Sequence, residues 1–194
     1  MTLAMSPALS RTLNALGLLG VCAVLAVAFF DQLVFGDLPC PLCLLQRAGF
    51  VGAGVGLALN VRFGPRPSHY AMMMLAAAVG CAVSVRQMLL HIAPGDPGFG
   101  DPLLGLHFYT WATIVFIAII LGGALMMLFD SQFTFDITPP AWSGLALAAV
   151  IFALLMALGN GVSTVLECAG GLCPDNPTTY QLLEDGTLKS LFGR

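Results

Sequence analysis

The chain has 194 residues, of which 58% are hydrophobic and only 9% are charged, and its mean hydropathy is +0.92. A soluble domain carries about 25% charged residues, so this chain could not cover a water-facing surface and is expected to be an integral membrane protein. Seven basic residues and a net charge of −3 argue against a nucleic acid as its partner.

Five apolar segments are long enough to cross a bilayer, which takes about 20 residues. The first resembles a signal peptide, but it is longer than the usual apolar region of one, and no convincing small-x-small cleavage site precedes Asp31. In chain order the segments are Leu13–Phe35, Leu42–Val61, Tyr70–Ile92, Phe108–Phe129 and Ala141–Asn160. We predict an all-α integral membrane protein: a four-helix transmembrane bundle (residues 1–130), a linker with a fifth transmembrane helix (131–160), and a Cys-containing tail on the outer face (161–194).

The basic residues orient these segments. Arg11 precedes the first, and Arg62 and Arg66 lie between the second and third, so these regions should be cytoplasmic. Alternation then places the tail on the outer side, with the first and third loops. Two cysteine pairs far apart in sequence, Cys40/Cys43 and Cys168/Cys173, should therefore share one face of the membrane. In a bacterium that face is the oxidising one, where disulfides persist.

The motif Cys40-Pro41-Leu42-Cys43 opens the second segment. Two cysteines separated by two residues can exchange disulfides, form a static bridge, or contribute half of a zinc site. A bridge over so short a loop would add little stability, and the other pair has a different spacing, so we favour exchange and expect no metal. Free N–H groups at a helix start favour the thiolate. Cys40, before the helix, should be reachable from water, and Cys43 should lie nearer the membrane.

Arg47 lies four residues after Cys43, on the same helical face. A guanidinium at this depth can bind the carbonyl oxygens of a membrane quinone. The plainer interpretation is an interfacial arginine that reaches the lipid headgroups, and Gln46 beside it could be equally passive.

Arg86 and His91 form a second group of candidates, near the end of the third segment. Charges inside a membrane are functional candidates, so both are predicted to lie near the quinone. Arg86 could instead reach the outer surface, and His91 could be a passive interfacial residue. His107 and Tyr109, at the start of the fourth segment, are weaker candidates.

The tail cysteines, Cys168 and Cys173, flank a glycine-rich turn. They could staple a surface loop, or they could form a second exchanging pair between a soluble partner and Cys40/Cys43. The stretch from Asn176 to Leu183 could form a short helix on the outer face. The single cysteines, Cys22 and Cys81, lie inside apolar segments and should behave as small buried hydrophobes.

The run Cys40-Pro41-Leu42-Cys43-Leu44-Leu45-Gln46-Arg47 resembles the first outer loop and second helix of the DsbB family of bacterial disulfide-bond formation proteins. Arg86 to Pro94 also resembles that family's third helix, and the whole resemblance covers approximately Leu13 to Phe129. It implies a four-helix enzyme of the inner membrane, a protein-disulfide:quinone oxidoreductase with its redox sites on the periplasmic side. Such an enzyme reoxidises a DsbA-like periplasmic thiol oxidase and passes electrons to ubiquinone or menaquinone. Cys43 would form the thiolate–quinone complex, and Arg47 would bind the quinone.

The chain departs from this pattern in one loop. DsbB carries its second redox pair between helices three and four, whereas Ala93 to His107 contains no cysteine here. We hypothesise that Cys168/Cys173 replaces the missing pair, which would make all four cysteines catalytic.

Two other functions fit some of these features. A vitamin K epoxide reductase-like enzyme also pairs a Cys-x2-Cys motif with a quinone, but its active pair usually lies late in the chain. A non-enzymatic membrane scaffold with structural disulfides would give no reason for Arg47 beside the motif or Arg86 within a span.

Overall fold

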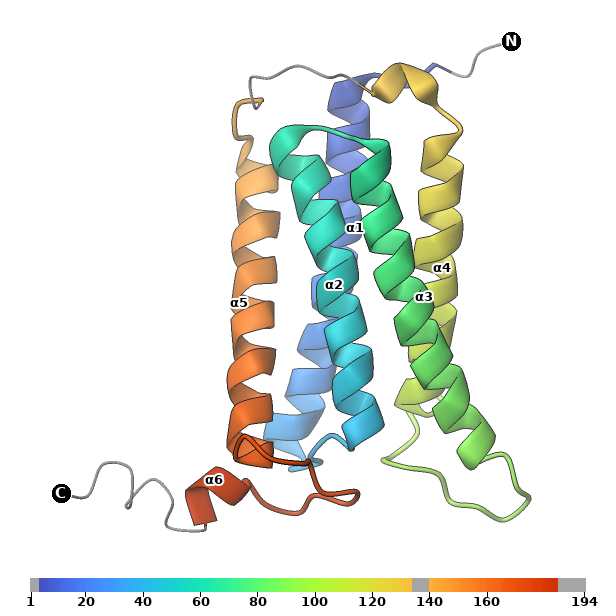
Figure 1. Cartoon of the computed structure of the whole chain (residues 1–194), viewed down its shortest axis with the longest axis vertical. Coiled ribbons are helices and arrows are strands. Elements are labelled where there is room, and N and C mark those ends of the chain that lie inside the picture. Colours follow the sequence, from blue (N-terminus) through green and yellow to red (C-terminus); the bar gives the residue numbers. More distant parts are fainter. Residues whose placement is uncertain (1–3, 134–139, 185–194) are drawn as a thin grey trace, which may run out of the picture.

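The computed structural model describes residues 4–133 and 140–184. Five long helices run alongside one another in these residues (Figure 1): α1 (Pro7–Val34), α2 (Pro41–Phe63), α3 (Pro67–Leu90), α4 (Phe108–Met127) and α5 (Gly144–Cys168). All five are long and apolar enough to cross a membrane. The predicted fold class, an all-α membrane bundle with a fifth transmembrane helix, is confirmed. A 3-10 turn, η1 (Asp130–Gln132), follows α4, and a short helix, α6 (Gln181–Glu184), lies in the tail.

The helix starts follow from local sequence. Pro7, Pro41 and Pro67 occupy the first helical positions of α1, α2 and α3, where the missing N–H has no helical partner and the fixed φ suits the helix. Side-chain caps precede two of these helices, from Ser6 and Cys40. The Cys40-Pro41-Leu42-Cys43 motif is thus also the local signal that begins α2.

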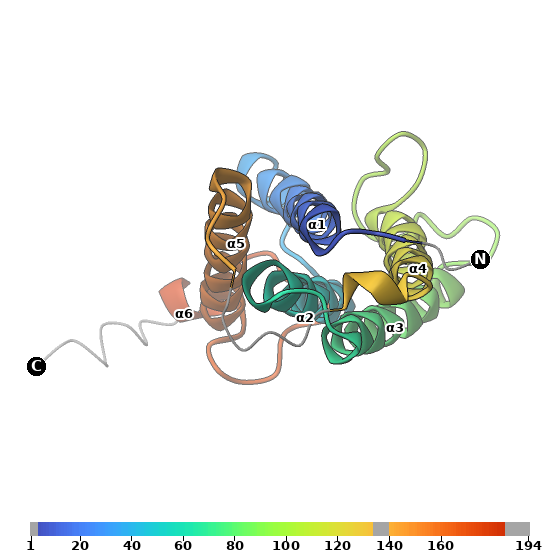
Figure 2. The same ribbon diagram turned by 90° about the horizontal axis from the view of Figure 1, so that it is seen from above.

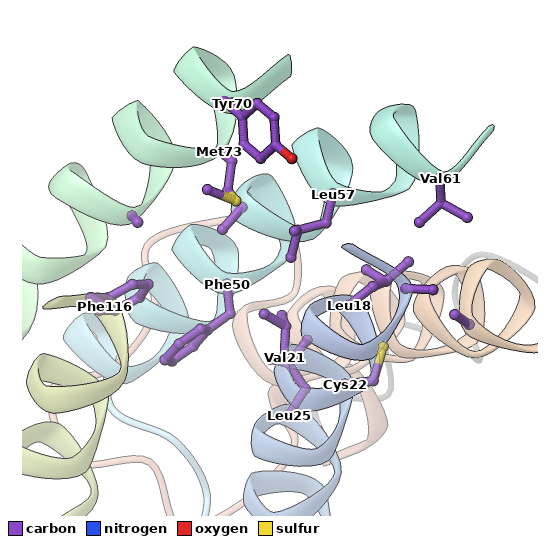
Figure 3. Packing of buried hydrophobic residues seen from close by; sticks show 14 of the residues in the cluster. Leu18, Val21, Cys22, Leu25, Phe50, Leu57, Val61, Tyr70, Met73 and Phe116 are labelled. Atoms are coloured by element: carbon purple, nitrogen blue, oxygen red, sulfur yellow. The ribbon is translucent and has the colours of Figure 1, made fainter. Parts of the chain in front are cut away.

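Helix α2 lies at the centre of the molecule, packed against α1, α3 and α5 (Figure 2). Its contact with α3 depends on small residues, because a Cβ on Gly56 would come within 2.6 Å of the His69 carbonyl oxygen. Figure 3 shows the buried cluster that α2 shares with its neighbours, in which Phe50 stacks on Phe116 of α4 with ring centroids 4.0 Å apart.

The ring of helices is incomplete on one side. Helix α3 packs extensively against α4, and α1 packs against α2 and α5, but α1 and α4 make no extensive contact with each other. In the view from above, α1 and α4 lie on the same side of the α2–α3 pair, α1 next to α2 and α4 next to α3 (Figure 2). This arrangement leaves room for a site between α1 and α4.

Helix α5 continues to Cys168, eight residues beyond Asn160, where the sequence pattern ends the predicted span. Polar side chains there bond to the helix's own backbone: Asn160 Nδ2 donates to Met156 O at 2.8 Å, and Thr164 Oγ1 donates to Asn160 O at 2.8 Å. These bonds let short polar residues continue an apolar helix. The helix ends at Ala169, whose φ of 48° is left-handed.

Both cysteine pairs lie at the same end of the bundle, the lower end in Figure 1, where α2 begins and α5 ends. Arg11, Arg62 and Arg66 belong to the opposite end, where α1 begins and α2 turns into α3. An odd number of spans predicts that the tail after α5 lies on the same side of the membrane as the loop after α1. The two pairs are therefore brought to one surface although more than a hundred residues separate them in sequence.

Candidate functional site: a disulfide, an arginine and an apolar cavity

Cys40 and Cys43 form a disulfide at the N-terminus of α2, with their Cα atoms 4.9 Å apart. Cys40 is the N-cap residue, and its Sγ accepts a hydrogen bond from the Cys43 N–H at 3.1 Å. A sulfur held at the positive end of a helix is well placed to carry negative charge when the disulfide opens.

The exposure of the two sulfurs differs from the sequence prediction. Cys40 is only 5% exposed, whereas Cys43 is half-buried and lines a cavity. The prediction that Cys40 is reachable from water is wrong for this conformation, because Gln87 of α3 lies against its sulfur. A thiol that attacks Cys40 would have to enter past this contact.

Gln87 is a site residue that was not among those selected from the sequence. Its Nε2 lies 3.3 Å from Cys40 Sγ and 3.6 Å from Cys43 Sγ, within the range of an N–H donor to sulfur. Its Oε1 accepts from Gln46 Nε2 at 2.7 Å. Gln46 is therefore not passive, since it fixes the orientation of the amide that faces the disulfide. The sequence signal was present, because Gln87 is a polar residue one turn before the end of an apolar helix.

Arg47 is buried, with 9% of its surface exposed, rather than extended to the headgroups. Its Nη1 donates to Gln32 Oε1 at 2.5 Å and its Nη2 donates to Ala28 O at 3.0 Å, both on α1. The guanidinium also lies 5.4 Å from the centre of the Phe29 ring. Two of its five N–H donors take part in these bonds, so the group is held in place and retains donor capacity.

Cys43 and Arg47 line one cavity of about 330 Å³. The cavity lies between α1, α2 and α4, and the loop that precedes α4 also contributes to its wall. Its other polar contributors are Gln46 and two carboxylates, Asp31 and Asp37. The rest of the wall is mainly apolar and includes Val24, Ala28, Leu38, Phe50, Phe99, Leu103, Trp111, Ala112 and Val115. A mainly apolar cavity with a few convergent polar groups is the usual form of a small-molecule site.

The other predicted cofactor residues lie elsewhere. Arg86 is exposed and does not line the cavity. His91 lies outside the cavity wall, with its ring stacked on Tyr109, which does line the cavity, at a centroid distance of 5.8 Å. His91 Nδ1 is also 3.0 Å from Asp96 Oδ1. The Gly98 N–H and His91 both hydrogen-bond to Asp96 and hold the pKa of that carboxyl below its ordinary value.

The tail cysteines also form a disulfide, between Cys168 at the end of α5 and Cys173, with Cα atoms 4.5 Å apart. Cys168 is 4% exposed and Cys173 is half-buried, while Leu172 between them is 96% exposed. Tyr180, further along the tail, accepts a hydrogen bond from Gln32 Nε2 at 2.8 Å. The tail is thereby attached to α1, the helix whose Gln32 and Ala28 accept hydrogen bonds from Arg47.

A known protein family matches the part of the chain that contains the Cys40–Cys43 motif. The family model described as "Disulfide bond formation protein DsbB" matches residues 10–100 of the chain. This stretch contains the Cys40–Cys43 motif, Arg47, Gln87 and His91 and stops before α4, α5 and the tail. We find no solved structure that matches the chain.

Several bacterial relatives are similar over a longer stretch. The "Disulfide bond formation protein B" of Marinobacter nauticus is 36% identical over 152 residues, which cover 72% of this chain and 83% of the relative. The protein of the same name from Xanthomonas axonopodis pv. citri is 32% identical over 147 residues, 70% of this chain and 85% of the relative. The chain belongs to the DsbB family of membrane proteins of disulfide bond formation, and this membership implies disulfide oxidoreductase activity.

Proposed function

We propose that this protein is a thiol:quinone oxidoreductase of a bacterial inner membrane that reoxidises a DsbA-like, thioredoxin-fold thiol oxidase on the periplasmic side. The observation that carries the proposal is the cavity in which Cys43 and Arg47 share a mainly apolar wall. A redox-active sulfur beside a lipid-compatible pocket suits an electron acceptor that dissolves in the membrane.

The shape and chemistry of the cavity fit a quinone ring. The volume of about 330 Å³ falls at the lower end of the range of small-molecule sites. The aromatic and aliphatic walls suit a flat apolar ring, and Arg47 offers N–H donors to a carbonyl oxygen. Because α1 and α4 make no extensive contact with each other, an acceptor with a long apolar tail could enter between them from the lipid.

The chemistry balances as a two-electron transfer. A bound quinone accepts two electrons and two protons, and the dithiol of Cys40 and Cys43 supplies both as it closes to a disulfide. Arg47 remains charged throughout and stabilises negative charge that develops on the acceptor oxygen. Asp31, on the same wall, provides a carboxyl group that can hold a proton within the cavity.

The tail disulfide completes a route from the soluble partner. A partner thiolate would attack Cys168–Cys173 through a mixed disulfide, and the resulting tail thiols would reduce Cys40–Cys43 by the same exchange. Two electrons and two protons move at each exchange, so the partner leaves oxidised. The position of both disulfides at one end of the bundle supports this order.

The test is quinone absorbance during addition of a reduced thioredoxin-like partner to the purified protein in detergent. We expect quinone loss in the parent protein and at least a hundredfold slower loss in Cys43→Ala, because the sulfur beside the cavity is gone. Cys22→Ala is the matched control, since Cys22 is a buried free cysteine of α1 and its loss leaves both disulfides intact. Equal rates in Cys43→Ala and the parent would contradict the proposal.

A further inference from the structure

Gln32 connects the arginine of the cavity to the fifth helix and the tail. It lies in the last turns of α1 and is 2% exposed. Its Oε1 accepts from Arg47 Nη1, while its Nε2 donates to Ser163 Oγ of α5 at 2.7 Å and to Tyr180 OH of the tail at 2.8 Å. One side chain thus joins three parts of the molecule that are distant in sequence.

The chemistry of these groups fixes the orientation of the Gln32 amide. Arg47 has only donors, so the amide oxygen must face it. Both amide hydrogens are then directed at hydroxyl oxygens, which can accept them. The flipped amide would place an NH2 group against a guanidinium and leave the hydroxyls opposite a carbonyl oxygen. The hydroxyls of Ser163 and Tyr180 therefore help to keep the Gln32 oxygen directed at Arg47.

A buried carboxyl group lies close to the same cluster. Glu167 is one helical turn after Ser163 on α5 and is fully buried, and neither of its carboxyl oxygens has a hydrogen-bond partner among the described residues. Its neighbour on the helix, Ser163, accepts from the Gln32 amide that in turn accepts from Arg47. This carboxyl group belongs to α5 and does not line the cavity, so it offers Arg47 no reason to stay in the acceptor site, whereas Gln32 does.

We propose that Gln32, Ser163 and Tyr180 are positioning residues that hold Arg47 in the acceptor site, so that the fifth helix and tail determine how tightly a quinone binds. This proposal rests on the proposed function, since it concerns the same cavity. It gives α5 and the tail a second role besides carrying the Cys168–Cys173 pair. It also predicts that substitutions in the tail, outside the cavity, change the affinity of the cavity for its ligand.

The test measures binding without turnover. The chain has two tryptophans, of which Trp111 lines the cavity and Trp142 stacks with Arg62 at the other end of the bundle. In a Trp142→Phe background, Trp111 alone reports on the cavity. A water-soluble short-chain ubiquinone analogue is titrated into the protein with both disulfides closed, so that neither cysteine pair can reduce it. Quenching of Trp111 fluorescence then gives the dissociation constant.

We expect Tyr180→Phe and Ser163→Ala each to raise the dissociation constant about threefold to tenfold, as for the loss of one buried hydrogen bond. Arg47→Ala should raise it further. Thr164→Val is the matched control, because among the described residues the Thr164 hydroxyl bonds only to the backbone of its own helix. Its loss should leave the constant unchanged. Gln32→Ala is the direct variant, and the two milder variants keep the test valid if it does not fold.

The outcomes separate the two proposals. If Arg47→Ala weakens binding but Tyr180→Phe and Ser163→Ala match the Thr164→Val control, the positioning role is wrong and the quinone site stands. If the parent protein shows no saturable quenching by the analogue, the quinone site is contradicted and the positioning role with it. If Thr164→Val weakens binding as much as the two test variants, the effect is general to α5 and the positioning role is also contradicted.

Discussion

At the scale of single residues, the site depends on amides as much as on sulfur and charge. Gln87 faces both sulfurs of the Cys40–Cys43 pair, Gln46 orients Gln87, and Gln32 orients Arg47. An amide can hold a thiolate or a guanidinium without adding a charge to a low-dielectric site, where an unpaired charge would be costly.

Replacing Gln87 with Leu should make the Cys40–Cys43 disulfide harder to reduce. N–H donors stabilise thiolate sulfur more than disulfide sulfur, so their loss disfavours the reduced form. The loss of a hydrogen bond worth about 1 kcal/mol corresponds to a shift of about −20 mV in the reduction potential of this two-electron couple. Equilibration with a series of dithiol buffers measures this potential. Leu89→Ala, an exposed position on the same helix, is the control, and an equal shift in both variants would exclude a specific effect of Gln87.

At the scale of helices, polar side chains also join the bundle at the end opposite the disulfides. Asn60 Nδ2 donates to Asn14 Oδ1 at 2.9 Å, and Asn60 Oδ1 accepts from the Arg66 N–H and lies 3.1 Å from His69 Nδ1. Asn14 in turn donates to the Tyr70 hydroxyl at 2.7 Å. These bonds connect α1, α2 and α3 where the hydrophobic effect gives little specificity between apolar helices in a membrane.

Asn60→Leu should destabilise the bundle by about 2–4 kcal/mol, because it leaves several buried polar groups without partners at a cost of about 1–3 kcal/mol each. Unfolding in mixed micelles, followed by circular dichroism, measures the change. Thr12→Val serves as the control, since within residues 4–133 and 140–184 the exposed Thr12 hydroxyl bonds only to Ala8 O of its own helix. A loss of stability no larger than that of the control would show that the network is not structurally important.

The sequence predicted most of the helices because hydropathy and proline positions are local signals. The second, third and fourth spans agree closely, and α1 begins at Pro7, before the predicted Leu13. The fifth helix extends beyond the predicted end since Asn160 and Thr164 bond to their own helix backbone. The site was only partly predictable. Cys43 and Arg47 share a helical face, which spacing shows, but the contacts of Gln32 and Gln87 join different helices and depend on packing that no local pattern encodes. Arg86, chosen for its charge, is exposed and outside the cavity.

At the scale of the whole molecule, the fifth helix determines where the tail disulfide lies. It packs on α1 and α2 and brings Cys168–Cys173 to the end of the bundle that holds Cys40–Cys43. The loop between α3 and α4 contains no cysteine, so the tail pair is the other disulfide available at that end. We expect it to receive electrons from the soluble partner in place of a loop pair.

The measurement that tests this account most directly compares two electron donors in a Cys168→Ala, Cys173→Ala double variant. A reduced thioredoxin-like partner should no longer drive quinone loss, because its entry point is gone, whereas a small dithiol that can reach Cys40–Cys43 should still do so at a rate near that of the parent. This result would establish the tail pair as the entry site for electrons. Quinone loss driven by the protein partner at the parent rate would contradict the relay and leave Cys168–Cys173 as a structural staple.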